Sequence, residues 1–331
     1  MEDISRRDFI KRTFAAGATG ALVLSTGKNG IAEAGTPDGK SFGTFIDLTK
    51  CDGCAGKVTP LCVSACRIKN NGRFPDPKEP IPDNWPTGKK EDWSKKREMT
   101  DKLTPYNWTY VQTVKVEGKE LNVPRRCMHC DNPPCANLCP FGVQDKTAEG
   151  AVVIDHDGCF GGAKCRDVCP WDIPQRQAGV GLYMKIAPGL IGGGVMYKCD
   201  LCIDLIRKGK NPACVDACPN AAAVFGEKEE VRELAQARAG EIGGHIYGDK
   251  ENGGTSTFYV SPVSFDKVHA AIMAEKEKAP KPERVGIPGM KPGEENYLDT
   301  GNGMILSYAV APVAGALAAG VAAYRVMKGE K

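Results

Sequence analysis

The arrangement of cysteines limits what this chain can fold into more than any other feature. Its 331 residues include 15 cysteines, which fall into four groups. Each group opens with a C-x2-C pair, or with C-x2-G in group three, and closes with C-x3-C. The groups are Cys51, Cys54, Cys62 and Cys66; Cys127, Cys130, Cys135 and Cys139; Cys159, Cys165 and Cys169; and Cys199, Cys202, Cys214 and Cys218. The odd number excludes a fully paired disulfide framework.

The spacing of the cysteines predicts iron–sulfur clusters. Three closely spaced thiolates can bind one cluster, while the fourth, which precedes proline, binds the other cluster of a two-cluster ferredoxin unit. Proline follows three of the four groups, at Pro140, Pro170 and Pro219. Four groups therefore predict two such units and four clusters. Zinc, which also uses C-x2-C pairs, is the main alternative, and structural disulfides are a weaker one.

Group three lacks one ligand, because Gly162 stands where the second cysteine of the group would be. A glycine has no side chain to bind iron. We predict a [3Fe–4S] cluster at this position and three [4Fe–4S] clusters at the others. Two alternatives stay open, namely a [4Fe–4S] cluster whose fourth iron binds water, or a ligand from elsewhere such as Asp157.

The N-terminus has the features of an export signal. Two arginines in the run Ser5–Lys11 are followed by a weakly apolar stretch and an A-x-A cleavage site at residues 32–34. This order predicts a Tat signal peptide over residues 1–34. Tat carries folded cargo, so we expect a metalloprotein loaded in the cytoplasm and exported to the periplasm.

The C-terminus contains an uncharged run of 21 residues, 304–324. This length suits a transmembrane helix, and the basic residues in the tail 325–331 place that tail in the cytoplasm. The sequence thus predicts a single-pass protein on the periplasmic face of the inner membrane.

Between these ends we expect one four-cluster domain over residues 35–278, followed by a Pro- and Lys-rich linker over 279–303. Short strands are expected at Gly43–Leu48, at Gly150–Asp155 and directly after group four, and a helix at Glu227–Ala239. An irregular insert, about residues 67–126, is too long for a plain loop. The predicted fold class is α+β: two pseudo-symmetric ferredoxin-like units with loop insertions, plus the transmembrane helix.

The four groups resemble those of the four-cluster iron–sulfur subunits of the DMSO-reductase and formate-dehydrogenase type. The resemblance implies that groups one and four share two clusters, and that groups two and three share the other two. Carried over by position, it gives cluster A (Cys51, Cys54, Cys62, Cys218), cluster B (Cys199, Cys202, Cys214, Cys66), cluster C (Cys127, Cys130, Cys135, Cys169) and cluster D (Cys159, Cys165, Cys139, with Gly162 at the vacant position).

Other segments are similar to the HybA-type iron–sulfur subunit of quinone-linked periplasmic [NiFe] hydrogenase. They are the Tat start, D-K-L-T-P-Y at Asp101–Tyr106, C-M-H-C at Cys127–Cys130, and H-I-Y-G-D-K-E-N-G-G-T at His245–Thr255. Group one departs from the pattern, with seven residues between its second and third cysteines and with Arg67 in place of the proline.

The resemblance implies a non-catalytic electron-transfer subunit in anaerobic respiration. Its partners would be a periplasmic hydrogenase small and large pair and a polytopic quinone-reactive membrane protein. A molybdopterin enzyme such as formate dehydrogenase, or a multihaem cytochrome complex, is the first alternative as partner. The remaining alternatives are a zinc-stabilised membrane-tethered binding module and an enzyme acting at the open iron of cluster D. The net charge of +3 and the absence of a long basic stripe in the sequence exclude nucleic acid as a partner.

Overall fold

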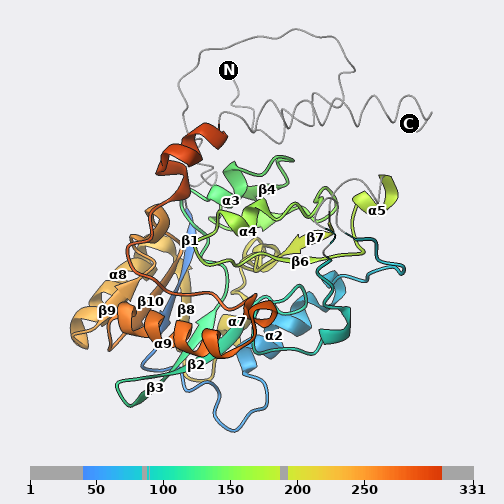
Figure 1. Ribbon diagram of the computed structural model, residues 1–331. Coiled ribbons are helices and arrows are strands. Elements are labelled where there is room, and N and C mark those ends of the chain that lie inside the picture. The colour runs from blue at the N-terminus through green and yellow to red at the C-terminus, as the bar shows by residue number, and fades with distance from the viewer. Residues whose placement is uncertain (1–39, 84–87, 89, 187–192, 308–331) are drawn as a thin grey trace, which may run out of the picture.

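The computed structural model describes residues 40–83, 88, 90–186 and 193–307 (Figure 1). Its strands are β1 (Phe42–Asp47), β2 (Tyr110–Val116), β3 (Lys119–Arg125), β4 (Gln144–Lys146), β5 (Val152–Ile154), β6 (Gln175–Gln177), β7 (Val195–Tyr197), β8 (Ala223–Glu227), β9 (His245–Tyr247) and β10 (Thr257–Ser261). Its helices are α2 (Leu61–Asn70), α3 (Pro134–Asn137), α4 (Lys164–Asp167), α5 (Tyr183–Ile186), α6 (Ile203–Ile206), α7 (Ala213–Asp216), α8 (Lys228–Glu241) and α9 (Phe265–Lys278).

One sheet has the strand order β8-β1-β10-β9 and joins the first and last cysteine groups. Strand β1 leads into group one, and β8 follows group four. The two strands pair antiparallel, with Ile46 opposite Ala223 at the end nearest the cysteines. This pairing brings groups one and four together, although more than a hundred residues separate them in the chain.

Two short hairpins connect the remaining groups. The antiparallel pair β4–β5 lies between groups two and three, and the pair β6–β7 lies between groups three and four. The strands expected near Gly43–Leu48, Gly150–Asp155 and after group four are confirmed as β1, β5 and β8, and the expected helix at Glu227–Ala239 is α8. Each cysteine group is therefore flanked by backbone that is fixed by strand pairing.

The sheet separates two apolar regions. Phe45, Phe258 and Val260 pack on Val231 and Ala235 of α8 on one face. Residues of the opposite parity, such as Ile46 and Tyr259, point into the main core, as alternation along a strand requires. Several cysteines belong to that main core, namely Cys66, Cys127, Cys130, Cys135, Cys159, Cys165 and Cys199. The candidate ligands are thus inside the packed body of the protein.

The stretch expected to be an irregular insert contains regular structure. Residues 110–125 form the hairpin β2–β3, which alternates buried and exposed positions along β2. The rest of the insert runs over the body, as the blue-green segments of Figure 1 show. Residues of the expected linker 279–303 lie against the same body: Met290 is fully buried, and Leu103 N donates to Gly286 O at 2.8 Å.

The predicted fold class needs a correction at the C-terminus, and so does the predicted single-pass location with a cytoplasmic tail. Within the part of the chain that the structure describes, there is no helix with the length and apolar character needed to cross a membrane. The rest of the predicted span and the predicted signal peptide, residues 308–331 and 1–34, lie outside the described residues.

Candidate metal centres

All 15 cysteines are free thiols in the structure, and they gather in four sets. The first set joins group one to the last cysteine of group four. Burial raises the pKa of Cys62 to about 12, and the adjacent thiols of Cys214, Cys51, Cys54 and Cys218 add to the rise. Three members of this set come from one loop, while Cys218 arrives from the other end of the domain.

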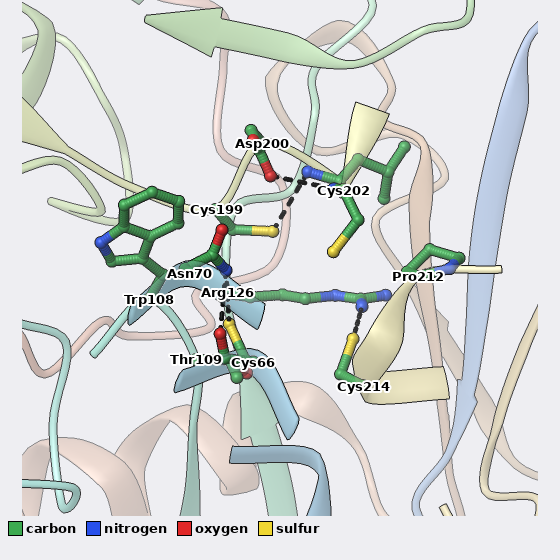
Figure 2. Close-up of a pocket in the computed structure, with 11 residues that line it drawn as sticks. Cys66, Asn70, Trp108, Thr109, Arg126, Cys199, Asp200, Cys202, Pro212 and Cys214 are labelled. Carbon is green, nitrogen blue, oxygen red and sulfur yellow. Dashed lines mark hydrogen bonds between the residues drawn. The ribbon is translucent and has the colours of Figure 1, made fainter. Parts of the chain in front are cut away.

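The second set is the reciprocal one. Burial raises the pKa of Cys66 well above its usual value, and the neighbouring thiols are those of Cys199, Cys214 and Cys202. Group four thus contributes three cysteines, and group one contributes its last. These four cysteines line a common pocket, which Figure 2 shows.

The other two sets exchange cysteines between groups two and three. Burial raises the pKa of Cys130 well above its usual value, with Cys135, Cys169 and Cys127 as the neighbouring thiols. Burial likewise raises the pKa of Cys165, to which Cys135, Cys159 and Cys139 contribute. The last cysteine of each group therefore lies with the first cysteines of the other group.

The four sets follow one another in a row. Cys62 of the first set is close enough to Cys214 of the second for each charge to be felt, and Cys199 of the second is similarly close to Cys127 of the third. Among the neighbouring thiols that raise the pKa of Cys165 in the fourth set, Cys135 of the third set contributes most. A negative charge on one set therefore raises the pKa of thiols in the next set.

A repeated turn shapes the loop after the first cysteine of each group. The residue two positions after that cysteine is left-handed in all four groups, with φ of 66° at Gly53, 51° at His129, 65° at Gly161 and 59° at Leu201. This turn exposes backbone N–H groups toward the sulfur of the first cysteine: Gly161 N and Leu201 N lie 3.5 and 3.4 Å from the sulfurs of Cys159 and Cys199.

The third cysteine of each group lies near the start of a short helix. Cys135, Cys165 and Cys214 are the second residues of α3, α4 and α7, and each helix ends before the fourth cysteine. The following proline cannot continue a helix, so the chain turns away. In group one Arg67 replaces that proline, and α2 continues to Asn70. The departure seen in the sequence is thus accommodated by a longer helix.

Gly162 lies in the chain between Cys159 and Cys165 of the fourth set, and it is exposed, with open space around it. A Cβ built on Gly162 would meet no atom within 4 Å, and its φ is not in the left-handed region. The alternative ligand, Asp157, is an exposed residue. Burial raises the pKa of Cys159, and the carboxylate that adds to this rise is that of Asp155.

His129 is fully buried and links two sets: its backbone lies between Cys127 and Cys130 of the third set, and its ring reaches Cys199 of the second. Its Nδ1 accepts a hydrogen bond from Val152 N at 3.0 Å, so its Nε2 carries the proton. That Nε2 lies 3.6 Å from the sulfur of Cys199. His129 is therefore a buried residue whose ring nitrogen faces a candidate ligand sulfur.

Sequence reasoning missed two buried cations. Arg126 and Lys198 directly precede the first cysteines of groups two and four, and both are less than one-tenth exposed. Lys198 donates to Cys199 O at 3.1 Å. The signal that could have revealed them is a basic residue immediately before a first cysteine, although Lys50 has the same place in group one and is exposed.

These features fit iron–sulfur clusters. Each set offers three or four buried or partly buried thiols. Backbone N–H groups point at the sulfurs of Cys159 and Cys199, and the Arg126 guanidinium donates to the sulfur of Cys214, as suits an anionic cluster. Among residues 40–307 as described, no three His, Cys, Asp or Glu side chains lie close enough together to hold a single metal ion. The thiols must lose their protons to bind metal, and burial without metal opposes this, raising the pKa of Cys51 and Cys202 to about 11.

Two family models match the cysteine-rich part of the chain. Residues 50–143 and residues 119–228 each match a 4Fe-4S dicluster domain. The chain is a ferredoxin-like iron–sulfur protein.

Relatives of this iron–sulfur protein are similar to it over most of its length. A protein of Nitratidesulfovibrio vulgaris strain Hildenborough is 31% identical over 270 residues, which are 79% of this chain and 65% of that protein. Hydrogenase-2 operon protein HybA of Escherichia coli O157:H7 is 29% identical over 307 residues, 80% of this chain and 83% of HybA. The formate dehydrogenase-O iron-sulfur subunit of Escherichia coli K12 is 29% identical over 254 residues, 72% of this chain and 73% of that subunit.

The matches confirm the prediction of an electron-transfer iron–sulfur protein related to HybA. They support iron–sulfur clusters as the cofactors and a role beside a catalytic subunit in general terms.

Proposed function

We propose that this iron–sulfur protein is a non-catalytic electron carrier with three [4Fe–4S] clusters and one [3Fe–4S] cluster. The ligands are those assigned above to clusters A, B, C and D, with Gly162 at the vacant position of cluster D. When bound, the clusters supply one-electron redox chemistry. The chain itself supplies the thiolates, the N–H donors to sulfur and the surrounding apolar core.

The exchange of cysteines between groups is the observation that supports this proposal most. Cys218 lies with group one, and Cys66 lies with group four, in agreement with two-cluster sharing. Zinc sites have no need of such an exchange, because the four cysteines of one group could fold around a single ion.

Serine variants test the ligand assignment. Cys218→Ser belongs to group four by sequence but to cluster A by the proposal, whereas Cys214→Ser belongs to cluster B. Anaerobically purified full-length variants, measured by iron and sulfide content and by EPR during reductive titration, should each lose a different cluster. If both variants weaken the same signal, the proposed assignment fails. A colourless protein that contains zinc would overturn the whole proposal.

The row of sets supports a relay role. In each pair of neighbouring sets, from cluster A to cluster D, a thiol of one set shifts the pKa of a thiol in the next. Four clusters in such a row would let an electron pass from one cluster to the next between the two ends. A protein of this form needs a donor at one end and an acceptor at the other. We propose a [NiFe] hydrogenase as one partner, since HybA covers 80% of the chain, and a quinone-reactive membrane protein as the other.

A formate dehydrogenase-like molybdopterin enzyme is the second candidate for the catalytic partner, supported by the similarity to the formate dehydrogenase-O iron-sulfur subunit. Affinity purification of the native protein in mild detergent, with mass spectrometry of the bound subunits, separates the two. A [NiFe] large subunit would support the first candidate, and a molybdopterin subunit the second. Recovery of neither class, from cells in which the protein is loaded with iron, would contradict the relay role.

A further inference from the structure

Arg126 occupies an unusual place between two cysteine sets. It follows β3 directly and precedes Cys127, so its backbone belongs to the loop of cluster C. Its side chain, only 3% exposed, runs instead into the pocket formed by cluster B ligands. Figure 2 shows it extended among Cys66, Cys199, Cys202 and Cys214.

The same side chain also lines the neighbouring cavity. That cavity is bounded by the four cysteines assigned to cluster A and by Cys214, which belongs to cluster B. Arg126 and Cys214 therefore form part of the wall shared by the two cavities. A charge placed there acts on both clusters.

The guanidinium of Arg126 makes one hydrogen bond to a sulfur, and two of its nitrogens have no partner among the described residues. Its Nη1 donates to Cys214 Sγ at 2.9 Å. Its Nε and Nη2 are buried and have no hydrogen-bond partner among the described residues. A buried cation with unsatisfied donors strongly destabilises the folded state unless an anion compensates it.

The carboxylate in this pocket is engaged elsewhere. Asp200 lines the pocket beside Arg126, but its Oδ1 accepts from Cys202 N at 2.9 Å and its Oδ2 is paired with Arg73. The negative charge that remains available to Arg126 is that of cysteine thiolates and the inorganic sulfide they surround. The geometry therefore points to the clusters as the anions whose charge Arg126 compensates.

We propose that Arg126 is the shared counter-ion of clusters A and B and holds the reduction potentials of both above those of the same clusters without it. The proposal rests on the ligand assignment of the proposed function. Reduction adds one electron, and hence one negative charge, to a cluster. A fixed cation and a hydrogen bond to a ligand sulfur both stabilise the reduced form more than the oxidised form, and both are established determinants of cluster potential.

The test is a redox titration of the full-length, anaerobically loaded protein, followed by EPR with dye mediators as the electron source. Arg126→Gln keeps a polar side chain but removes the charge. At a fixed ambient potential near each midpoint, we expect the ratio of reduced to oxidised cluster to fall at least tenfold for clusters A and B. A tenfold change corresponds to about 59 mV for a one-electron couple. Cluster D serves as the internal reference and should keep its ratio.

Arg125→Gln is the matched control. Arg125 is the adjacent residue, is fully buried and likewise has two nitrogens without a partner among the described residues, Nε and Nη1, but it lines neither of the two cavities. Its Nη2 donates to Gly289 O at 2.7 Å, and its guanidinium lies over the ring of Tyr259. The control loses the same charge from the same place in the chain. We expect it to shift the potentials of clusters A and B far less than Arg126→Gln does.

A second variant covers the case in which Arg126→Gln does not assemble. Arg126→Lys keeps the charge but loses the planar fork of donors, so it should lower the potentials of clusters A and B by less than Arg126→Gln while sparing cluster D. Unchanged potentials of A and B in every loaded Arg126 variant would overturn the inference. Failure of the proposed function would look different, because the wild-type protein itself would then lack four distinguishable clusters.

Discussion

The carboxylate of Glu91 is bound in a fork by Arg166, with Nη1 and Nη2 at 2.7 and 2.8 Å from its two oxygens. Glu91 belongs to the insert of residues 67–126, and Arg166 directly follows Cys165 in α4. Arg176 adds a third bond to Glu91 at 2.6 Å and donates to Gly161 O at 2.9 Å. The insert thereby stabilises the loop 159–165, which contains two of the cysteines assigned to cluster D.

Glu91→Gln should loosen this loop. The substitution removes the charge-assisted fork and leaves two partly buried arginines without a carboxylate. Hydrogen bonds to charged groups contribute about 1.5–3 kcal/mol each, and partial exposure reduces that value here. We expect a lower thermal midpoint and a selective loss of cluster D, measured by integrating its EPR signal against those of the other clusters. Glu98→Gln is the control, because Glu98 is 94% exposed beside Arg67 and such pairs contribute about 0–1 kcal/mol.

The contribution of Glu91 should depend on pH. Burial alone would raise the pKa of Glu91, but its hydrogen bonds and the charges of Arg166 and Arg176 outweigh burial and hold the pKa below the usual 4.5. A carboxyl whose pKa is depressed by folding stabilises the protein above its unfolded pKa, and the contribution is lost as the pH falls through the folded value. The difference in unfolding free energy between wild type and Glu91→Gln should thus be constant near pH 7 and shrink below pH 4.5. A difference that grows on acidification would contradict this.

The four cysteine groups could be recognised in the sequence because their signal is local and repeated, whereas their exchange of cysteines between sets was expected only from the family resemblance. The left-handed residues at Gly53, His129, Gly161 and Leu201 show the same turn after the first cysteine of each group, including group three, where Gly162 replaces the second cysteine. Strands β1, β5 and β8 were predictable from short apolar runs such as 152–154, whereas β4 and β6 are polar segments that give no such signal.

What the sequence could not reveal depends on tertiary contacts. The hairpin β2–β3 is an exception: residues 113–123, T-V-K-V-E-G-K-E-L-N-V, alternate around a Glu-Gly turn, a hairpin signal that the surrounding irregular insert concealed. The positions of Arg126 and His129 follow from the way one cysteine unit packs on the other. The residue pattern around Arg126 and His129 in the sequence does not predict their contacts with Cys214 and Cys199.

His129→Asn tests the link between the two units. Asn adopts the left-handed backbone found at position 129 more readily than most residues, but its amide is too short to replace both contacts of the ring. The N–H of Val152 would lose its acceptor, and an unsatisfied buried group costs about 1–3 kcal/mol. We expect a lower thermal midpoint of the loaded protein, whereas His245→Asn, at an exposed residue, should leave it unchanged. Equal effects of the two variants would argue against a structural role for the buried imidazole.

Gly162→Cys tests the vacant position of cluster D directly. The backbone there suits any residue, and a Cβ meets nothing within 4 Å, so the protein has room for a fourth thiol. We expect the EPR signal of an oxidised [3Fe–4S] cluster to disappear and a fourth [4Fe–4S] cluster to appear during reductive titration. The added thiolate makes the site more negative, so the potential of cluster D should fall. Gly162→Ala adds the Cβ without the thiol and should keep the [3Fe–4S] signal. If wild type, loaded with iron, already lacks that signal, then the fourth iron has another ligand and Gly162 does not determine the type of cluster.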